Sequence, residues 1–218
     1  MTVAGLVLDV LRRVYRFDAA FAATLWRLLR EPAVLMKDYL AGRRAGYLDP
    51  IHYLISALFA QLLVTAFTHW LAPLLERTSA FGWLWLGRLN GVLALKVLSI
   101  FWMGTLWRVM FRPGRYNLAE IYVLGMYAFG TTTILWAALP LLDLAVPQPL
   151  GADPVTVLLV MLALESAYLT YVVRQLSGLP LWECLARVIA VLTFGYAVLI
   201  AIIGPGRLAQ LLLPLRQG

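Results

Sequence analysis

Residues 51–75, IHYLISALFAQLLVTAFTHWLAPLL, contain no Asp, Glu, Lys or Arg. The hydrocarbon core of a bilayer is about 30 Å thick, and a helix of about 20 apolar residues crosses it. The stretch therefore predicts a transmembrane helix. The composition of the whole chain agrees, because 62% of its 218 residues are apolar and 13% are charged, against about 45–50% and about 25% in soluble domains.

Four further apolar stretches of similar length follow. Lys96 is the only charged residue of residues 89–107, and Glu165 is the only one of residues 155–173. We predict helices, because barrel strands alternate apolar and polar residues and these stretches do not. The expected fold is an all-α membrane protein with an interfacial cytoplasmic segment at residues 1–50 and a transmembrane domain at residues 51–218. Its five spans are predicted at about residues 51–75, 89–111, 118–144, 154–175 and 181–204.

The boundaries between these spans carry helix start and stop signals. Asn117 and Glu120 have the spacing of a capping box before the third span. Pro154 suits the first helical position of the fourth span, and residues 177–180, Ser-Gly-Leu-Pro, predict a turn before the fifth.

Lysine and arginine are distributed unevenly between the two sides that the spans define. Thirteen fall on one side: Arg12, Arg13, Arg16, Arg27, Arg30, Lys37, Arg43, Arg44, Arg108, Arg112, Arg115, Arg174 and Arg187. Four fall on the other: Arg77, Arg88, Arg207 and Arg216. The positive-inside rule predicts a cytoplasmic N-terminus and a C-terminus outside, in the periplasm. Topology thus explains the net charge of +7, and no nucleic-acid partner is expected.

The first 30 residues have the pattern of a basic amphipathic helix. Apolar residues from Val3 to Leu28 recur at steps of three, four and one, and Arg12, Arg13 and Arg16 lie mostly off that face. Such a helix either lies in the cytoplasmic interface with its arginines on anionic lipid, or docks on the protein's own cytoplasmic loops. A second, short helix is predicted from residue 32 to residue 42.

The segment before the first span has the pattern Asp38-Tyr39-Leu40-x-Gly42-Arg43-Arg44-x-x-Tyr47-x-x-Pro50. It resembles a family of uncharacterised bacterial integral-membrane proteins with a Gly-Lys/Arg-Arg-x-x-Tyr-x-x-Pro signature, which implies a bacterial inner membrane. Many members of that family begin with a zinc ribbon of two Cys pairs, a segment that this sequence does not contain. Residues 115–120 and the last turn are similar, more loosely, to the five-span Yip (Ypt-interacting protein) membrane proteins. That similarity implies a cytoplasmic N-terminus and partners in membrane traffic.

The signature residues also have a physical interpretation. Gly42 would end the short helix, Arg43 and Arg44 would lie at phosphate level, and Tyr47 would anchor among the headgroups. These residues form either a basic aromatic hinge at the membrane boundary or a site for an anionic headgroup or a partner. With Arg12, Arg13 and Arg16, they are the candidate lipid- or partner-binding residues.

Lys96 and Glu165 are the charged residues that lie deep inside predicted spans, within the apolar stretches 89–107 and 155–173. A charge at the bilayer centre costs about 2.5–3.5 kcal/mol on insertion scales, so each should face the bundle and find a partner. The two could pair, or Lys96 could extend outward and leave a protonated Glu165. Tyr168 shares the face of Glu165. A structural anchor and a functional proton relay both remain open.

The sequence contains no G-x-S-x-G, H-E-x-x-H, Walker or dinucleotide motif, and it holds one Cys and two His. We therefore expect no catalytic site, no metal site and no cofactor. The predicted function is that of a non-enzymatic inner-membrane scaffold or accessory protein that binds anionic lipid headgroups, other membrane proteins or a second copy of itself. The alternative is a small transporter or channel built around Glu165 and Lys96.

Overall fold

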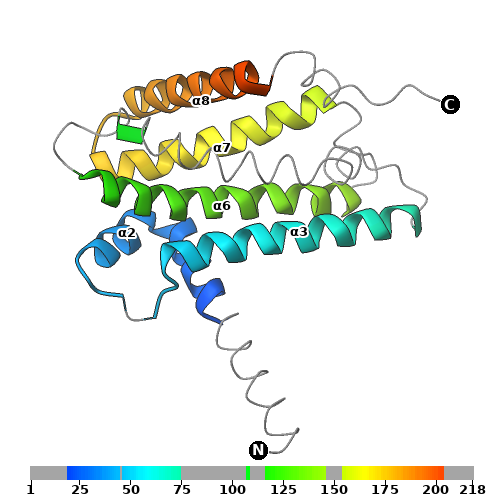
Figure 1. The fold of residues 1–218 in the computed structure, drawn as a ribbon, viewed down its shortest axis with the longest axis horizontal. Helices are drawn as coiled ribbons and strands as arrows, with labels where there is room; N and C mark the ends of the chain where they lie inside the picture. Colours follow the sequence, from blue (N-terminus) through cyan, green and yellow to red (C-terminus); the bar gives the residue numbers. More distant parts are fainter. Residues whose placement is uncertain (1–18, 45, 75–106, 109–115, 146–153, 204–218) are drawn as a thin grey trace, which may run out of the picture.

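A computed structural model of the chain describes residues 19–44, 46–74, 107–108, 116–145 and 154–203. Residues 19–30 form a helical segment, and the elements named after it are also helices (Figure 1). These helices are α2 (Pro32–Leu40), α3 (Pro50–Leu74), α6 (Leu118–Ala145), α7 (Pro154–Ser177) and α8 (Leu181–Ile203). No strand occurs within these described ranges, which confirms the predicted all-helical class.

Three of the helices are long and apolar enough to cross a membrane: Pro50–Thr68, Leu118–Leu142 and Leu181–Val198. They belong to α3, α6 and α8, and they support the prediction of a membrane protein. The predicted span at about 154–175 forms α7, which is not one of the three and which contains Glu165 and Arg174. The predicted span at 89–111 lies outside the described residues except for 107–108. Five spans therefore stay a prediction.

The helices α3 and α6 run side by side in the same direction (Figure 1). Just before α3, the carbonyl of Leu48 accepts a hydrogen bond from the hydroxyl of Tyr127, in the first half of α6. One turn further along both helices, the hydroxyl groups of Tyr53 and Thr131 lie 3.0 Å apart. Both helices therefore begin at the end of the bundle where α2 lies.

A glycine allows α3 and α6 to approach closely. A Cβ atom at Gly130 would lie 2.7 Å from Cε1 of the Tyr53 ring and 3.5 Å from the Cα of Leu54. Small residues are typical of helix contacts in membranes, because packing rather than the hydrophobic effect holds such helices together.

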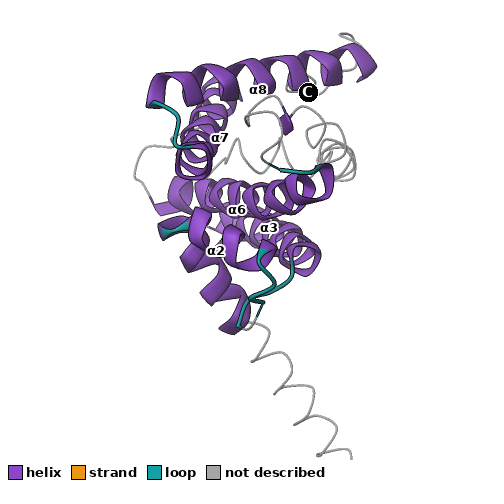
Figure 2. Cartoon of the chain, turned by 90° about the vertical axis from the view of Figure 1, so that its left-hand side faces the viewer, coloured by secondary structure: helices purple, strands orange, loops and turns teal. Residues whose placement is uncertain are grey.

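The helix α7 returns toward α2, and α8 runs back along α7 (Figure 1). Beside the turn that joins them, Ser177 Oγ lies 3.8 Å from the sulfur of Cys184. Further along, the Tyr196 hydroxyl donates to Glu165 at 2.9 Å. Seen from the end that holds α2, α8 is at one edge, α7 follows, then α6 and α3, and α2 lies on the opposite side (Figure 2).

The predicted start and stop signals of the later helices are confirmed. The Asn117 amide donates to the Glu120 carboxylate at 2.7 Å, and the Glu120 amide donates to the Asn117 side chain at 2.8 Å. Together these two bonds form a capping box at the start of α6. Pro154 is the first residue of α7, and the predicted turn at 177–180 joins α7 to α8.

Candidate functional site: a basic and aromatic cluster before α3

Residues 19–49, here called the interfacial segment, pack against one end of the bundle. In the helical part, Thr24 and Leu28 are fully buried, whereas Trp26, Arg27 and Arg30 are exposed. The described part of the predicted amphipathic helix therefore docks on the protein's own helices. The candidate residues Arg12, Arg13 and Arg16 lie outside the described residues.

Tyrosines of α7 hold the end of the helical part in place. The carbonyl of Leu28 would normally accept from the amide four residues later, but that residue is Pro32, which has no N–H. The hydroxyl of Tyr168 donates to this carbonyl instead, at 3.1 Å. The hydroxyl of Tyr171 donates to the carbonyl of Arg30. Two backbone carbonyls that have no donor in their own segment thus accept hydrogen bonds from α7, a helix distant in sequence.

The start of α2 is held by α7 as well. Its first turn has amide groups without helical partners, and the amide of Ala33 donates to the side-chain oxygen of Gln175 at 3.5 Å. Leu35 and Met36 are fully buried on the inner face of α2. The interfacial segment is therefore part of the packed structure.

The end of α2 explains the glycine of the signature. The Arg43 amide donates to the Asp38 carbonyl at 2.9 Å, and the Gly42 amide donates to the Tyr39 carbonyl at 3.0 Å. This pair of bonds is a Schellman motif, which needs a left-handed residue after the helix. Gly42 supplies it, with φ at +83°. The helix ends at Leu40, two residues before the predicted boundary.

Beyond this cap, arginines stack on aromatic rings. The Arg44 guanidinium carbon lies 4.9 Å from the centre of the Tyr39 ring. That of Arg27 lies 5.1 Å from the centre of the Tyr47 ring, and Arg27 also donates to the Tyr47 hydroxyl. On the helical part, Arg30 lies over the ring of Trp26 at 5.6 Å. Such contacts are worth about 0.5–1 kcal/mol at exposed sites.

The fourth arginine of this region, Arg43, pairs with a carboxylate. Its Nη2 atom lies 2.6 Å from Oδ1 of Asp38. In the part of the chain that the structure describes, none of the other three arginines has a carboxylate within 4 Å. We call these residues the basic–aromatic cluster: Arg27, Arg30, Arg43, Arg44, Trp26, Tyr39 and Tyr47.

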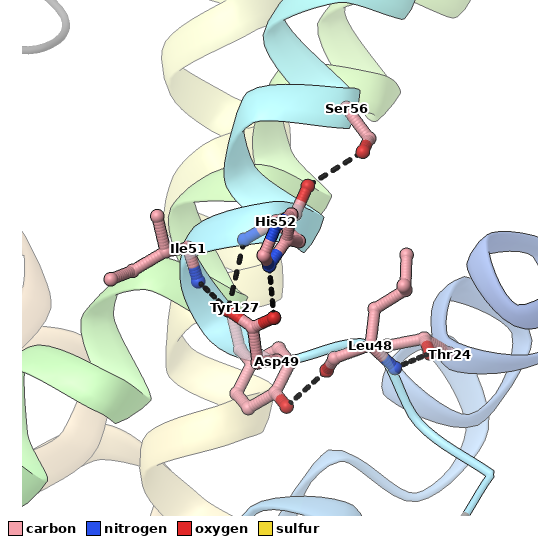
Figure 3. Close-up of polar contacts among 7 residues, drawn as sticks. All are labelled: Thr24, Leu48, Asp49, Ile51, His52, Ser56 and Tyr127. Carbon is pink, nitrogen blue, oxygen red and sulfur yellow. Dashed lines mark hydrogen bonds and ion pairs between the residues drawn. The ribbon is translucent and has the colours of Figure 1, made fainter. Parts of the chain in front are cut away.

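The cluster connects directly to the first candidate span through Leu48 (Figure 3). The Leu48 amide donates to the hydroxyl oxygen of Thr24 at 3.1 Å. Its carbonyl accepts from the Tyr127 hydroxyl at 2.6 Å. One loop residue therefore joins the helical part of the interfacial segment to α6.

Asp49 caps the start of α3 (Figure 3). Its Oδ1 atom accepts from the amides of Ile51 and His52, each at 3.1 Å, and its other oxygen pairs with the His52 ring. Burial alone would raise the pKa of the Asp49 carboxyl, but the hydrogen bonds and charge of His52, with the Ile51 amide, outweigh burial and lower the pKa. Pro50 follows as the first residue of α3.

The intramembrane candidate Glu165 is 1% exposed and accepts a hydrogen bond from Tyr196. Lys96, its predicted partner, lies outside the described residues, so their pairing stays a prediction. The hydroxyl of Tyr168, on the same face of α7, donates to Leu28. Sequence reasoning missed Tyr196, although counting along α7 and α8 from their shared turn puts Tyr196 and Glu165 at similar depth.

Comparison with known proteins gives one match. Residues 18–62 match a family described as protein of unknown function (DUF3667). The matched range contains the signature residues 42–50 and covers about a fifth of the chain. No curated protein and no solved structure matches the chain. Over residues 18–62, which hold the basic–aromatic cluster, the chain is similar to that family.

Proposed function

We propose that this chain is a non-enzymatic inner-membrane protein that binds anionic lipid headgroups at its basic–aromatic cluster, as a scaffold or accessory protein. One observation carries the proposal. Arg27, Arg30 and Arg44 lie on aromatic rings at the start of an apolar helix, with no carboxylate partner among the described residues.

The chemistry of the cluster suits a phosphate. A guanidinium has five N–H donors, and those that a neighbouring ring or hydroxyl does not use can donate to phosphate oxygens. Tyr and Trp are enriched where a protein meets the headgroups. Each Lys or Arg near an anionic membrane surface contributes about 1 kcal/mol of attraction. The cluster lies next to Pro50, where α3 begins.

The direction of the helices supports the predicted five spans. α3, α6 and α8 all begin at the end that holds the interfacial segment, and α7 runs the opposite way (Figure 1). A chain that crosses a membrane three times in one direction must return twice between those crossings. α7 is one return, and residues 89–111 are the apolar stretch available for the other.

This topology gives the cluster its side of the membrane. By the positive-inside rule, the end with the interfacial segment faces the cytoplasm. The cytoplasmic leaflet carries anionic lipids, whose potential attracts basic segments next to a span.

Lipid binding can be measured on the purified protein by native mass spectrometry. Phosphatidylglycerol should bind more tightly than phosphatidylcholine, and Arg27→Gln or Arg44→Gln should each lower its affinity about fivefold, from about 1 kcal/mol per cation. Arg108→Gln is the matched control, because Arg108 is exposed and outside the cluster. Equal binding of the two lipids, or equal effects of Arg44→Gln and Arg108→Gln, would overturn the proposal.

A second candidate function, a small transporter or channel, rests on the buried Glu165 and its bond to Tyr196. Buried carboxyls in membrane helices often belong to proton pathways. Proton flux into liposomes that Glu165→Gln abolishes would favour this function. Flux no greater than in empty liposomes would exclude proton transport.

A further inference from the structure

The four arginines of the basic–aromatic cluster form two pairs, one on the helical part of the interfacial segment and one in the loop after α2. Arg27 and Arg30 belong to the helical part of the interfacial segment, and a spacing of three puts them on one side of a helix. Arg43 and Arg44 follow Gly42 in the loop. Tyr47 lies between the pairs, since its ring and hydroxyl contact Arg27 and its amide donates to the Arg44 carbonyl at 3.4 Å.

Neighbouring side chains hold the arginines of each pair. On the helix, Arg27 and Arg30 lie over different rings, those of Tyr47 and Trp26. In the loop, Asp38 holds Arg43, and Tyr39 lies under Arg44. Side chains fixed in this way lose little conformational freedom when a ligand binds. The arrangement therefore offers two separate anion positions.

The charge of the interfacial segment fits two phosphates. Residues 19–49 contain five Lys and Arg and three Asp and Glu, so their net charge is +2. Of the three carboxylates, Asp38 is paired with Arg43 and Asp49 caps α3. No arginine that the structure describes lies within ion-pair distance of Glu31. Two phosphodiesters carry the charge of −2 that balances the segment.

We propose that the cluster is specific for a lipid headgroup with two phosphodiesters, one on the Arg27–Arg30 pair and one on the Arg43–Arg44 pair. This inference rests on the proposed function, because it assumes that the cluster binds anionic lipid. A lipid that occupies both positions gains affinity over two single-phosphate lipids, since its second contact is intramolecular.

Three lipids test this by native mass spectrometry of the whole protein. The probes are cardiolipin, which has two phosphodiesters joined by a glycerol, phosphatidylglycerol, which has one, and phosphatidylcholine, which has no net charge. At equal phosphate concentration, cardiolipin should bind at least about tenfold more tightly than phosphatidylglycerol. This comparison uses the unaltered chain, so it does not depend on the folding of a variant.

Two double variants separate the two positions. R27Q/R30Q removes the helix pair, and R43Q/R44Q removes the loop pair. Either should bring the affinity for cardiolipin close to that for phosphatidylglycerol, because only one pair of arginines remains to hold a phosphate. Lys37→Gln is the control, because Lys37 is an exposed cation of the same segment outside the cluster.

The outcomes distinguish this inference from the proposed function. Equal binding of cardiolipin and phosphatidylglycerol per phosphate, with both above phosphatidylcholine, would overturn the two-phosphate inference and leave headgroup binding intact. No preference for either anionic lipid would overturn both. Loss of all anionic binding in a single double variant would mean one merged site. Displacement of cardiolipin by equimolar inorganic diphosphate would assign the cluster to a soluble ligand, and would also contradict the inference.

Discussion

Replacing Gly130 by alanine should destabilise the contact between α3 and α6. The new Cβ would lie 2.7 and 2.9 Å from two atoms of the Tyr53 ring, which is closer than van der Waals contact. The ring cannot move aside freely, because its hydroxyl lies 3.0 Å from Thr131 Oγ1 and its face stacks on Phe21 at 5.3 Å. Either the two helices separate or Tyr53 gives up these contacts.

The size of the effect follows from opposing terms. Overpacking a well-packed contact costs about 1–3 kcal/mol, and losing the bond between the two hydroxyls adds about 1 kcal/mol. Alanine also stabilises the helix by up to about 1 kcal/mol relative to glycine, because glycine is a poor helix former. We therefore expect a net loss of about 2 kcal/mol, which for a chain of this length lowers Tm by about 4–8 °C.

Thermal unfolding in detergent measures this, with the fluorescence of the eight tryptophans as the signal. Gly125→Ala is the matched control on the same helix, because its added Cβ has no atom within 4 Å apart from the adjoining residues and nearby backbone of its own helix. The control should leave Tm unchanged or raise it. Placing Gly130→Ala in a Tyr53→Leu background should remove most of its effect, because the clashing ring is gone.

A Tm of Gly130→Ala equal to that of Gly125→Ala would refute the close approach of α3 and α6 at this position. Additive losses in the Gly130→Ala, Tyr53→Leu double variant would refute the assignment of the clash to Tyr53.

Three further changes test single contacts. Tyr127→Phe leaves the Leu48 carbonyl without its hydroxyl donor and should lower the free energy of unfolding, measured by denaturant titration, by about 1–3 kcal/mol. The lowered pKa of Asp49 stabilises the fold at pH values above the unfolded-state pKa, so stability should fall on acidification below about pH 4. Asp49→Asn should reduce this fall, measured as Tm against pH. Tyr196→Phe removes a donor from Glu165 and should cost about 1–3 kcal/mol, part of which Glu165→Gln should restore.

Each of these has a clear contrary result. Unchanged unfolding of Tyr127→Phe would mean that Leu48 does not depend on α6. If Tm falls equally at low pH in Asp49→Asn and in the unaltered protein, the pH dependence belongs to other carboxyls. Equal losses for Tyr196→Phe with and without Glu165→Gln would mean that the two side chains are not coupled.

The helix boundaries could be predicted because their signals are local. The capping box of Asn117 and Glu120 and the helix-starting positions of Pro50 and Pro154 depend on residues a few positions apart. Gly42 likewise ends α2 through bonds to residues just before it. Short-range patterns of this kind are present in the sequence itself.

The docking of the interfacial segment could not be predicted in the same way. Its bonds join residues 79 to 142 positions apart, and most of them end on backbone groups. Pro32 indicates that the Leu28 carbonyl lacks its helical donor, but nothing in the sequence identifies Tyr168 as the replacement. In the cluster, Arg43, Arg44 and Tyr47 were predicted, whereas the pairing of Arg27 with Tyr47 was not.

Other expectations stay predictions. The roles of Arg12, Arg13, Arg16 and Lys96 concern positions outside the described ranges. The similarity to the Yip proteins and the cytoplasmic N-terminus rest on pattern and charge.

The donors that hold the interfacial segment are synthesised long after the groups that they bind. Tyr168 follows Leu28 by 140 residues, and Tyr171 follows Arg30 by 141. A ribosome adds about 5–20 residues per second, so the wait is about 7–28 s. Helices form in about a microsecond.

For those seconds the nascent helix has an uncovered apolar face and no α7 to receive it. A membrane surface accepts such a face, with basic side chains toward the headgroups. We therefore expect lying on lipid and docking on the protein to be successive stages for this one segment. We expect the first stage to last until the fourth predicted span has been made.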